Sequence, residues 1–153
     1  MSNTFTQIHI QSVFAVKYRK ALIEAGWNER LHRYITGILQ MNGHKMLRVN
    51  SMPDHIHLVY GFRPDQSLSD LMRLVKGKSS EWINDEKLSP GYFRWQEGYG
   101  AFSYSKSDLP NVINYIMNQE EHHRKKSFLD EYKQLLKEFD MEYDERYIFK
   151  PLE

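Results

Sequence analysis

Two histidines separated by a single residue, His55 and His57, are the side chains of this sequence best suited to bind a metal ion. In a β-strand, residues i and i+2 project from the same face, so both imidazoles would point to one side and Ile56 to the other. Imidazole is the commonest metal ligand in proteins. The spacing predicts a metal site on a strand, although a pair of surface or edge-strand histidines would show the same pattern.

Tyr115 and Gln119 form the second pair with chemical potential. The segment 107–123 predicts a helix, with Ser107 as its N-cap and Pro110 in its first turn. Residues four apart lie on the same side of a helix, so the tyrosine hydroxyl and the glutamine carboxamide would project together. A tyrosine hydroxyl can act as a nucleophile in covalent catalysis. The alternative is a boundary tyrosine that only packs its ring beside the apolar stripe of Leu109, Val112, Ile113 and Ile116.

The elements that must position these side chains follow from the hydrophobic periodicity. Strands are expected at 4–16, 45–51 and 55–62, with one or two more within the aromatic stretch 92–104. Helices are expected at about 24–41, from Ser67 onward with Asp70 as a capping-box partner, at 107–123, and near 132–139. The first six elements match a ferredoxin-like (RRM-like) domain. We therefore predict an α+β fold, an antiparallel sheet with helices on one face, plus C-terminal helices that carry the nucleophile.

The length and composition exclude several classes of protein. The chain has 153 residues, the ordinary size of one domain. Metal hydrolases that use a His-x-His pair on an eight-stranded barrel need roughly 200 residues or more. There are no cysteines, so thiolate metal sites, disulfides and cysteine nucleophiles are excluded. The sequence shows neither a signal peptide nor an apolar run long enough to cross a membrane, so we expect a cytoplasmic protein with no membrane partner.

The net charge of +1 hides an asymmetry along the chain. Residues 1–126 carry 17 Lys and Arg against 12 Asp and Glu, whereas residues 127–153 carry four against eight. A mildly basic body is able to hold a phosphate backbone, although many ordinary domains share such a bias. The acidic segment after residue 126 has no role that its composition reveals.

Five short blocks give the chain a family resemblance. They are Val-Phe-Ala-Val-Lys-Tyr-Arg at 13–19, Pro-Asp-His-Ile-His-Leu at 53–58, Lys-Gly-Lys-Ser-Ser at 76–80, Trp-Gln-Glu-Gly-Tyr-Gly at 95–100 and Tyr-Ile-Met-Asn-Gln-Glu-Glu-His-His at 115–123. In this order and spacing the chain resembles the single-tyrosine transposases of the HUH nuclease superfamily, the Insertion Sequence 200/605 type, over about residues 5 to 125. The resemblance implies one transposase catalytic domain over 1–153, with an acidic helical extension at about 127–153.

The resemblance also implies a mechanism. A divalent cation, Mg²⁺ or Mn²⁺, would be held by His55, His57 and Gln119 and would act on the scissile phosphate. Tyr115 would attack that phosphate, giving a 5′-phosphotyrosine and a free 3′-OH, so that rejoining needs no ATP. Two nitrogen ligands are unusual for Mg²⁺, and we expect Mn²⁺ to bind more tightly.

The resemblance implies single-stranded DNA with hairpin ends as the partner, and a homodimer with shared active sites as the assembly. Segment 103–107 would then be the hinge that carries the tyrosine helix to the partner. The expected DNA-binding residues are Lys17, Arg19, Lys20, Lys76 and Lys78, and the candidate stacking groups are Tyr18, Trp95 and Tyr99. His122 and His123 lie near the helix end and are further candidates for the metal site.

Two other functions remain open at this point. A domesticated relative would bind hairpins or repeats and cut DNA without transposing. A non-catalytic nucleic-acid-binding module of related topology would need exposed aromatic residues on two central strands in a defined pattern, and this sequence contains no such run.

Overall fold

The centre of the molecule is a four-stranded antiparallel sheet, seen here in a computed structural model that describes residues 3–123 and 125–153. Its strands are β1 (His9–Ala15), β2 (Lys45–Met52), β3 (His55–Gly61) and β4 (Gly100–Tyr104), in the order β2-β3-β1-β4. This is the strand order of a ferredoxin-like domain, with the first and third strands in the middle. The predicted α+β class and topology are confirmed.

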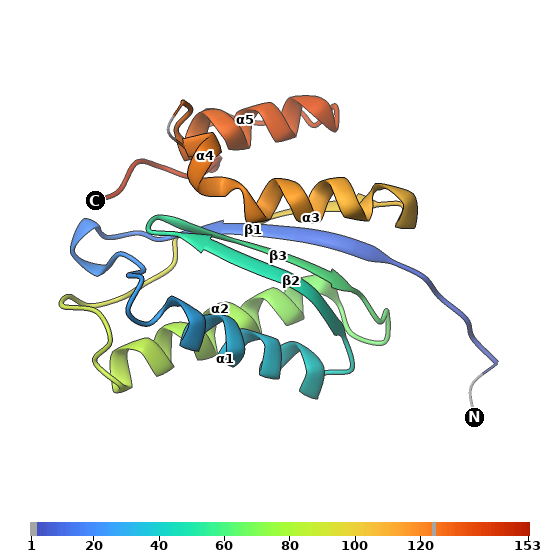
Figure 1. Ribbon diagram of the computed structural model, residues 1–153, viewed down its shortest axis with the longest axis horizontal. Coiled ribbons are helices and arrows are strands. Elements are labelled where there is room, and N and C mark those ends of the chain that lie inside the picture. The colour runs from blue at the N-terminus through green and yellow to red at the C-terminus, as the bar shows by residue number, and fades with distance from the viewer. Residues whose placement is uncertain (1–2, 124) are drawn as a thin grey trace.

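Helices cover both faces of the sheet (Figure 1). The two long helices, α1 (Asn28–Met41) and α2 (Leu68–Asp85), lie together on one face, as predicted. The C-terminal helices α3 (Leu109–Met117), α4 (Gln119–His123) and α5 (Phe128–Glu138) lie on the opposite face. Within the described residues, three short 3₁₀ turns occur at Arg19–Ala21, Lys106–Asp108 and Glu145–Tyr147. Among the described residues, no helix combines the length and the apolar character that crossing a bilayer requires.

The α1/α2 face holds the larger part of the core. Alternate residues of β1 and β3 point to this face, among them Phe14 and its partner Ile56, and both are fully buried. Both helices are amphipathic, and each turns its apolar stripe to the sheet. The stripes comprise Leu31, Ile35 and Leu39 of α1 and Leu71, Met72 and Val75 of α2, all without solvent exposure. Ser67 caps α2 as predicted, because its hydroxyl accepts the Asp70 N–H at 3.1 Å.

The opposite face of the sheet carries the two histidines. In the antiparallel register Val13 pairs with His57 and Ala15 with His55, so these four side chains share one face. Helix α3 contributes a small apolar cluster on this face, formed with Val59 of β3. Helix α5 contributes Phe128, Tyr132, Leu135 and Leu136, which all belong to the main core. Because both faces are covered, β1 is buried on both sides from its second residue onward.

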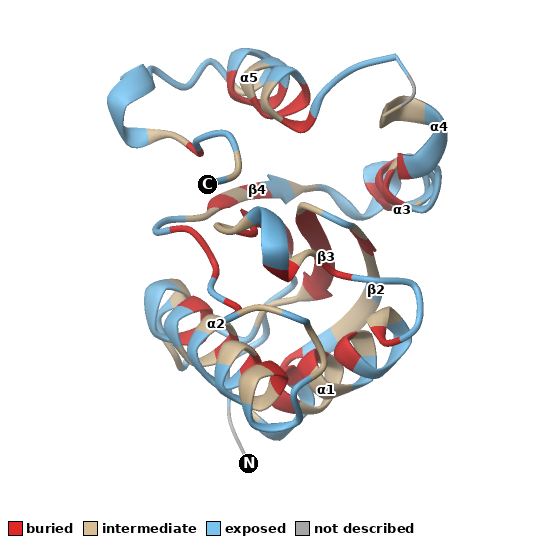
Figure 2. Ribbon diagram, turned by 90° about the vertical axis from the view of Figure 1, so that its left-hand side faces the viewer, coloured by how far each residue is buried: buried red, intermediate tan, exposed pale blue. Residues whose placement is uncertain are grey.

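One glycine allows α5 to approach the sheet closely. A Cβ atom at Gly100, the first residue of β4, would lie 2.7 Å from both Cε1 and the hydroxyl oxygen of Tyr132. Any larger residue would therefore push the tyrosine away (Figure 2 shows the buried side of α5 turned to β4). The acidic extension is thus an integral part of the packed molecule, and its helix has a fixed place above the sheet.

The one or two strands expected within the aromatic stretch 92–104 are a single strand, β4, and Trp95 forms an isolated bridge to Val16. Three other sequence-based expectations about the elements were wrong. Strand β1 begins at His9 and not at residue 4. Ser107 is not an N-cap, because it lies in a 3₁₀ turn and the helix begins at Leu109. The helix expected over 107–123 is interrupted at Asn118, whose N–H bonds back to both Asn114 O and Tyr115 O and closes the last turn of α3.

Candidate active site

His55 and His57 lie at the start of β3 and are completely buried. Nδ1 of His55 lies 2.7 Å from a carboxylate oxygen of Asp54, and Nδ1 of His57 lies 2.8 Å from the side-chain oxygen of Gln11. Both partners are acceptors, so each Nδ1 carries a proton and each Nε2 is the nitrogen left for a metal. Gln11 is itself held in place, because its amide N–H donates to the Tyr104 hydroxyl at 2.9 Å.

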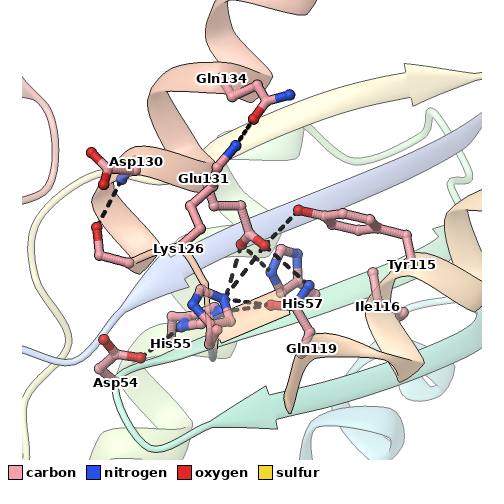
Figure 3. Close-up of polar contacts among 12 residues, drawn as sticks. Asp54, His55, His57, Tyr115, Ile116, Gln119, Lys126, Asp130, Glu131 and Gln134 are labelled. Carbon is pink, nitrogen blue, oxygen red and sulfur yellow. Dashed lines mark hydrogen bonds and ion pairs between the residues drawn. The ribbon is translucent and has the colours of Figure 1, made fainter. Parts of the chain in front are cut away.

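A carboxylate from α5, that of Glu131, lies at the centre of the cluster (Figure 3). Its Oε1 lies 3.2 Å from His57 Nε2 and 3.8 Å from His55 Nε2. Its Oε2 accepts a hydrogen bond of 2.5 Å from the Tyr115 hydroxyl and one of 3.2 Å from the Gln119 amide. Glu131 therefore connects the tyrosine directly to the histidine pair.

Gln119 reaches the same point from α4. Its side-chain oxygen lies 2.9 Å from His55 Nε2 and 3.0 Å from His123 Nε2, and the residue is fully buried. The break at Asn118 means that Tyr115 and Gln119 do not stack on one continuous helix, but both side chains still converge on Glu131. His122 takes a different place, with its ring stacked on that of Tyr115 at a centroid distance of 4.5 Å.

The cluster has the donor atoms that a divalent cation needs. One nitrogen each from His55 and His57 and one oxygen from Glu131 all lie within 4.8 Å of one another. Two imidazoles and a carboxylate form a donor set used by zinc, manganese and iron sites. Gln119 offers a further oxygen at the same point. The residues present therefore fit a divalent metal, with either Glu131 or Gln119 as the oxygen donor.

The cluster perturbs the acidity of its members. Burial by itself would raise the pKa of Glu131, but the hydrogen bond and the positive charge that His57 supplies when both its ring nitrogens are protonated, together with the hydrogen bond from Tyr115, lower it to about 2. Burial raises the pKa of Tyr115 above its ordinary value, and the hydrogen bond to Glu131 and the negative charge of Glu131 raise it further. Burial lowers the pKa of His57, against the opposing hydrogen bond to Glu131. Glu131 is therefore ionised, and the Tyr115 phenol beside it keeps its proton.

Glu131 was missed in the analysis of the sequence, although one signal could have found it. Phe128, Tyr132 and Leu135 form the buried stripe of α5, and Glu131 lies within that stripe. A carboxylate in an otherwise apolar stripe is costly unless it is paired, so its position indicates a buried partner. The family resemblance ended near residue 125 and directed attention to Gln119 instead.

The structure does not bring the predicted DNA-binding residues into this cluster. Lys17 and Lys76 are half-buried, and Arg19, Lys20 and Lys78 are exposed. The Lys76 ammonium donates to the carbonyl oxygens of Gln96 at 2.7 Å and Gly98 at 2.6 Å, and burial lowers its pKa to about 8. This lysine therefore ties the loop 96–98 to α2.

The candidate stacking groups lie elsewhere as well. The Trp95 ring is buried between Phe14 and Phe93, at centroid distances of 4.7 and 4.8 Å, so it is a core residue. Tyr18 and Tyr99 are half-buried and pack against the main core.

The nucleophile candidate borders an open pocket of about 690 Å³ between α3 and α5. The lining includes Tyr115, Glu131 and His122, but neither His55 nor His57. Two lysines at its rim, Lys125 and Lys126, are exposed. The tyrosine is thus reachable from this side, while the histidines lie beneath it.

The chain belongs to the IS200-like transposase family, because residues 4–119 match the model of the family described as "Transposase IS200 like". That match includes His55, His57, Tyr115 and Gln119 and ends before Glu131. The family membership implied by the five sequence blocks is confirmed, and with it the assignment to DNA transposition and mobile elements.

Individual relatives agree with this placement. The ISDra2 transposase TnpA of Deinococcus radiodurans is 26% identical over 119 residues, which are 74% of this chain and 84% of the relative. A crystal structure of a transposase from Deinococcus radiodurans R1 superposes with a TM-score of 0.62 at 22% identity, covering 78% of this chain and 95% of that chain. A REP-associated tyrosine transposase bound to a REP hairpin gives a TM-score of 0.60 at 14% identity, covering 80% and 74%. At such identities the two structures show a shared fold.

Proposed function

We propose that this protein cuts and rejoins single-stranded DNA, with Tyr115 as the nucleophile and a divalent cation, Mg²⁺ or Mn²⁺, bound at His55 and His57. The observation that supports this proposal most directly is the single carboxylate, Glu131, that joins the Tyr115 hydroxyl to His57 Nε2. A tyrosine buried only for packing would not need an ionised partner beside two metal-binding nitrogens. When bound, the cation would act as a Lewis acid that neutralises charge on the scissile phosphate.

The chain's own residues have distinct tasks in this reaction. The Tyr115 phenol gives its proton to its hydrogen-bond partner Glu131 and its oxygen forms a bond to the phosphorus. The bond from phosphorus to the 3′ oxygen breaks, and that oxygen takes a proton and leaves as a 3′-OH. Glu131 accepts the hydrogen bond of the phenol and holds its oxygen toward the histidines. His122 fixes the plane of the tyrosine ring by stacking. Attack of a 3′-OH on the phosphotyrosine reverses the step without an energy source.

Asp54 and Gln11 have the task of orienting the metal ligands. Each accepts the Nδ1 proton of one histidine and thereby keeps its Nε2 directed to the cation. The third ligand is an oxygen of Gln119, as expected from the family, or of Glu131, as the distances equally allow.

The DNA partner is proposed by analogy with a relative. A REP-associated tyrosine transposase of the same fold is bound to a REP hairpin, which supports a hairpin-bearing single strand as the substrate of this chain. We further propose that residues 1–153 act as one catalytic domain, since α5 contributes both to the core and to the cluster.

A covalent-adduct assay tests this function. Incubation with labelled single-stranded DNA and Mn²⁺ is expected to give an adduct that survives SDS, and Tyr115→Phe is expected to abolish the adduct while DNA binding remains. Tyr92→Phe is a matched control, because Tyr92 is exposed and lies outside the cluster. Mapping the adduct to another tyrosine by mass spectrometry would refute the assignment of Tyr115.

A further inference from the structure

Residues 149–153 are firmly attached beside the end of β1 (Figure 1). Phe149 is buried and packs on two aromatic rings of α5, at centroid distances of 4.8 Å to Tyr132 and 5.7 Å to Phe128. The backbone N–H of Glu153 donates to Lys17 O at 2.8 Å. Residues 149–153 therefore follow a defined path along the body of the protein.

A buried glutamine fixes this path. The side-chain oxygen of Gln96 accepts the Lys150 N–H at 2.7 Å, and its amide donates to Lys150 O at 2.8 Å and to Val16 O at 3.0 Å. Gln96 is only 8% exposed, and three hydrogen bonds satisfy its amide almost completely. Arg19 adds a bond from its Nε to Leu152 O at 3.2 Å. Side-chain and backbone hydrogen bonds thus hold this segment against the body of the protein.

The attached segment forms one wall of a groove of about 500 Å³, whose other wall is the loop 94–98. Four cationic side chains line it against two carboxylates, those of Glu97 and Glu153. The four cations are Lys17, Arg94, Arg146 and Lys150, and we call the groove that they line the basic groove. Asp144 pairs with the Arg146 guanidinium at 2.7 Å, so the other three cations provide most of the positive charge.

An exposed aromatic ring lies in the same groove. Tyr147 lines it and is 80% exposed, a high value for a large aromatic side chain. The Arg146 guanidinium lies over its ring, 5.4 Å from the centroid. Basic side chains beside an open aromatic ring are the combination that binds single-stranded nucleic acid, with phosphates on the cations and a base stacked on the ring.

The basic groove begins close to the histidine pair. Ala15 is the strand partner of His55, and the next residue, Val16, donates its N–H to Asp54 O at 2.9 Å. Lys17 follows, and its N–H donates to Arg94 O at 2.9 Å. Two residues of extended chain span roughly 7 Å. The groove residue Lys17 is thus only two residues along the chain from Ala15, the strand partner of His55, so the groove adjoins the histidine pair.

We propose that the basic groove, completed by the C-terminal segment Arg146–Lys150, binds the single-stranded DNA that adjoins the cleavage site. This inference rests on the proposed function and extends it. It assigns DNA contacts to Arg94, Tyr147 and Lys150, and it gives the acidic extension a binding role through its few basic residues. Of the DNA contacts predicted from the sequence, Lys17 is the one that lines this groove.

The test is the salt dependence of DNA binding. The double variant Arg94→Gln/Lys150→Gln is expected to weaken binding of a single-stranded oligonucleotide, and to reduce the slope of log K against log salt by about 1.4, since each lost phosphate contact on a single strand removes about 0.7. Tyr147→Ala is expected to weaken binding about fivefold or more through lost stacking. Lys45→Gln/Arg48→Gln on β2 and Tyr143→Ala are the matched controls, because these exposed side chains lie outside the groove.

Adduct formation separates this proposal from the proposed function. The groove variants are expected to form the Tyr115 adduct at saturating DNA and to bind Mn²⁺ as the wild type does, because none of the altered side chains contacts the cluster. Wild-type affinity and salt slope in the groove variants, with the adduct intact, would overturn the groove and leave the nuclease standing. Absence of the adduct in the wild type would refute the nuclease, whereas the salt slopes would still decide whether the groove binds DNA. Retained DNA binding with loss of binding to an acidic peptide would assign the groove to a protein partner and overturn the proposal.

Discussion

At the scale of single residues, the site depends on one buried carboxylate. Glu131 contacts His57, Tyr115 and Gln119 with its two oxygens, so it competes with Gln119 for the role of third metal ligand. A carboxylate brings a charge that offsets that of the cation, whereas a carboxamide does not. The two residues also differ in location, since Gln119 lies at the end of the family match and Glu131 lies beyond it.

Metal binding distinguishes these two ligands. His55→Ala and His57→Ala are each expected to remove most Mn²⁺ binding and metal-dependent cleavage, because the remaining ligands hold a cation poorly. If Glu131 is the third ligand, Glu131→Ala should lower the Mn²⁺ affinity by more than about 10- to 100-fold, the loss that removing only a hydrogen-bond partner of a ligand causes. Titration calorimetry measures this, with Glu138→Ala on the same helix as the control. If Glu131→Ala binds Mn²⁺ normally and Gln119→Ala binds it weakly, Gln119 is the third ligand. Full activity of the wild type in the presence of EDTA would refute the need for a metal.

Acid sensitivity is a second consequence of Glu131. Its pKa is lowered in the folded protein to about 2 from an ordinary value of 4.5, so the folded state binds fewer protons than the unfolded state between these values. The stabilisation is therefore fully present above about pH 4.5 and is lost as the pH falls toward 2, on the order of 2 kcal/mol. Urea unfolding of the metal-free protein between pH 6 and 2.5 is expected to show a steeper loss of stability for the wild type than for Glu131→Gln. Parallel curves for the two proteins would contradict this.

At the scale of elements, helix α5 both closes the core and positions Glu131. Its buried face comprises Phe128, Tyr132, Leu135 and Leu136, and the Phe128 ring stacks on the His55 imidazole at a centroid distance of 4.1 Å. The histidines are buried because this helix lies above them. Its close approach depends on Gly100, where β4 leaves room for the Tyr132 ring.

A substitution at Gly100 tests the position of α5. Gly100→Ala places a methyl group 2.7 Å from Tyr132, so the helix must move, and we expect a loss of about 1–3 kcal/mol in the free energy of unfolding. Because Glu131 precedes Tyr132, adduct formation should fall as well. Gly77→Ala is the control, since nothing lies within 4 Å of its Cβ position in α2 and alanine favours a helix by roughly 0.5–1 kcal/mol. Unchanged stability and activity of Gly100→Ala would show that α5 does not hold this position in solution.

At the scale of the whole molecule, one chain brings all the described members of the cluster together. Tyr115 lies against the histidines of its own chain, through Glu131. The homodimer with shared active sites remains a prediction from the family. Sharing would require α3 to leave its own sheet, where Asn50 of β2 holds it through a bond of 2.6 Å to Ile116 O.

Complementation decides between own-chain and shared sites. Neither Tyr115→Phe nor His57→Ala alone should cleave DNA. If each site is built within one chain, every site of a mixed dimer still contains one of the two substitutions. The arrangement in this structure therefore predicts no rescue when the two variants are co-expressed with different tags and the heterodimer is purified. Cleavage by a verified heterodimer would instead show that the tyrosine helix exchanges between subunits. A monomer in solution would refute the predicted dimer.

The sequence by itself determined the features that depend on near neighbours. The period of two around 55–62 placed both histidines on one face of a strand, and the order of elements predicted the ferredoxin-like sheet. The motif at 115–123 indicated Tyr115 and Gln119, and both lie in the cluster. The strand inference held because strand geometry relates residues only two positions apart, whereas the single helix expected to carry Tyr115 and Gln119 is interrupted at Asn118.

Only the tertiary structure decided which distant residues meet there. Glu131, Gln11 and Asp54 reach the histidines from α5, from β1 and from the turn before β3, and no spacing in the sequence relates Glu131 or Gln11 to them. The same holds for Lys76, whose ammonium donates hydrogen bonds to the carbonyl oxygens of Gln96 and Gly98, some 20 residues away along the chain. Such contacts are selected by the packing of whole elements across the sheet, because the free energy of burying polar groups depends on the partners that the fold provides.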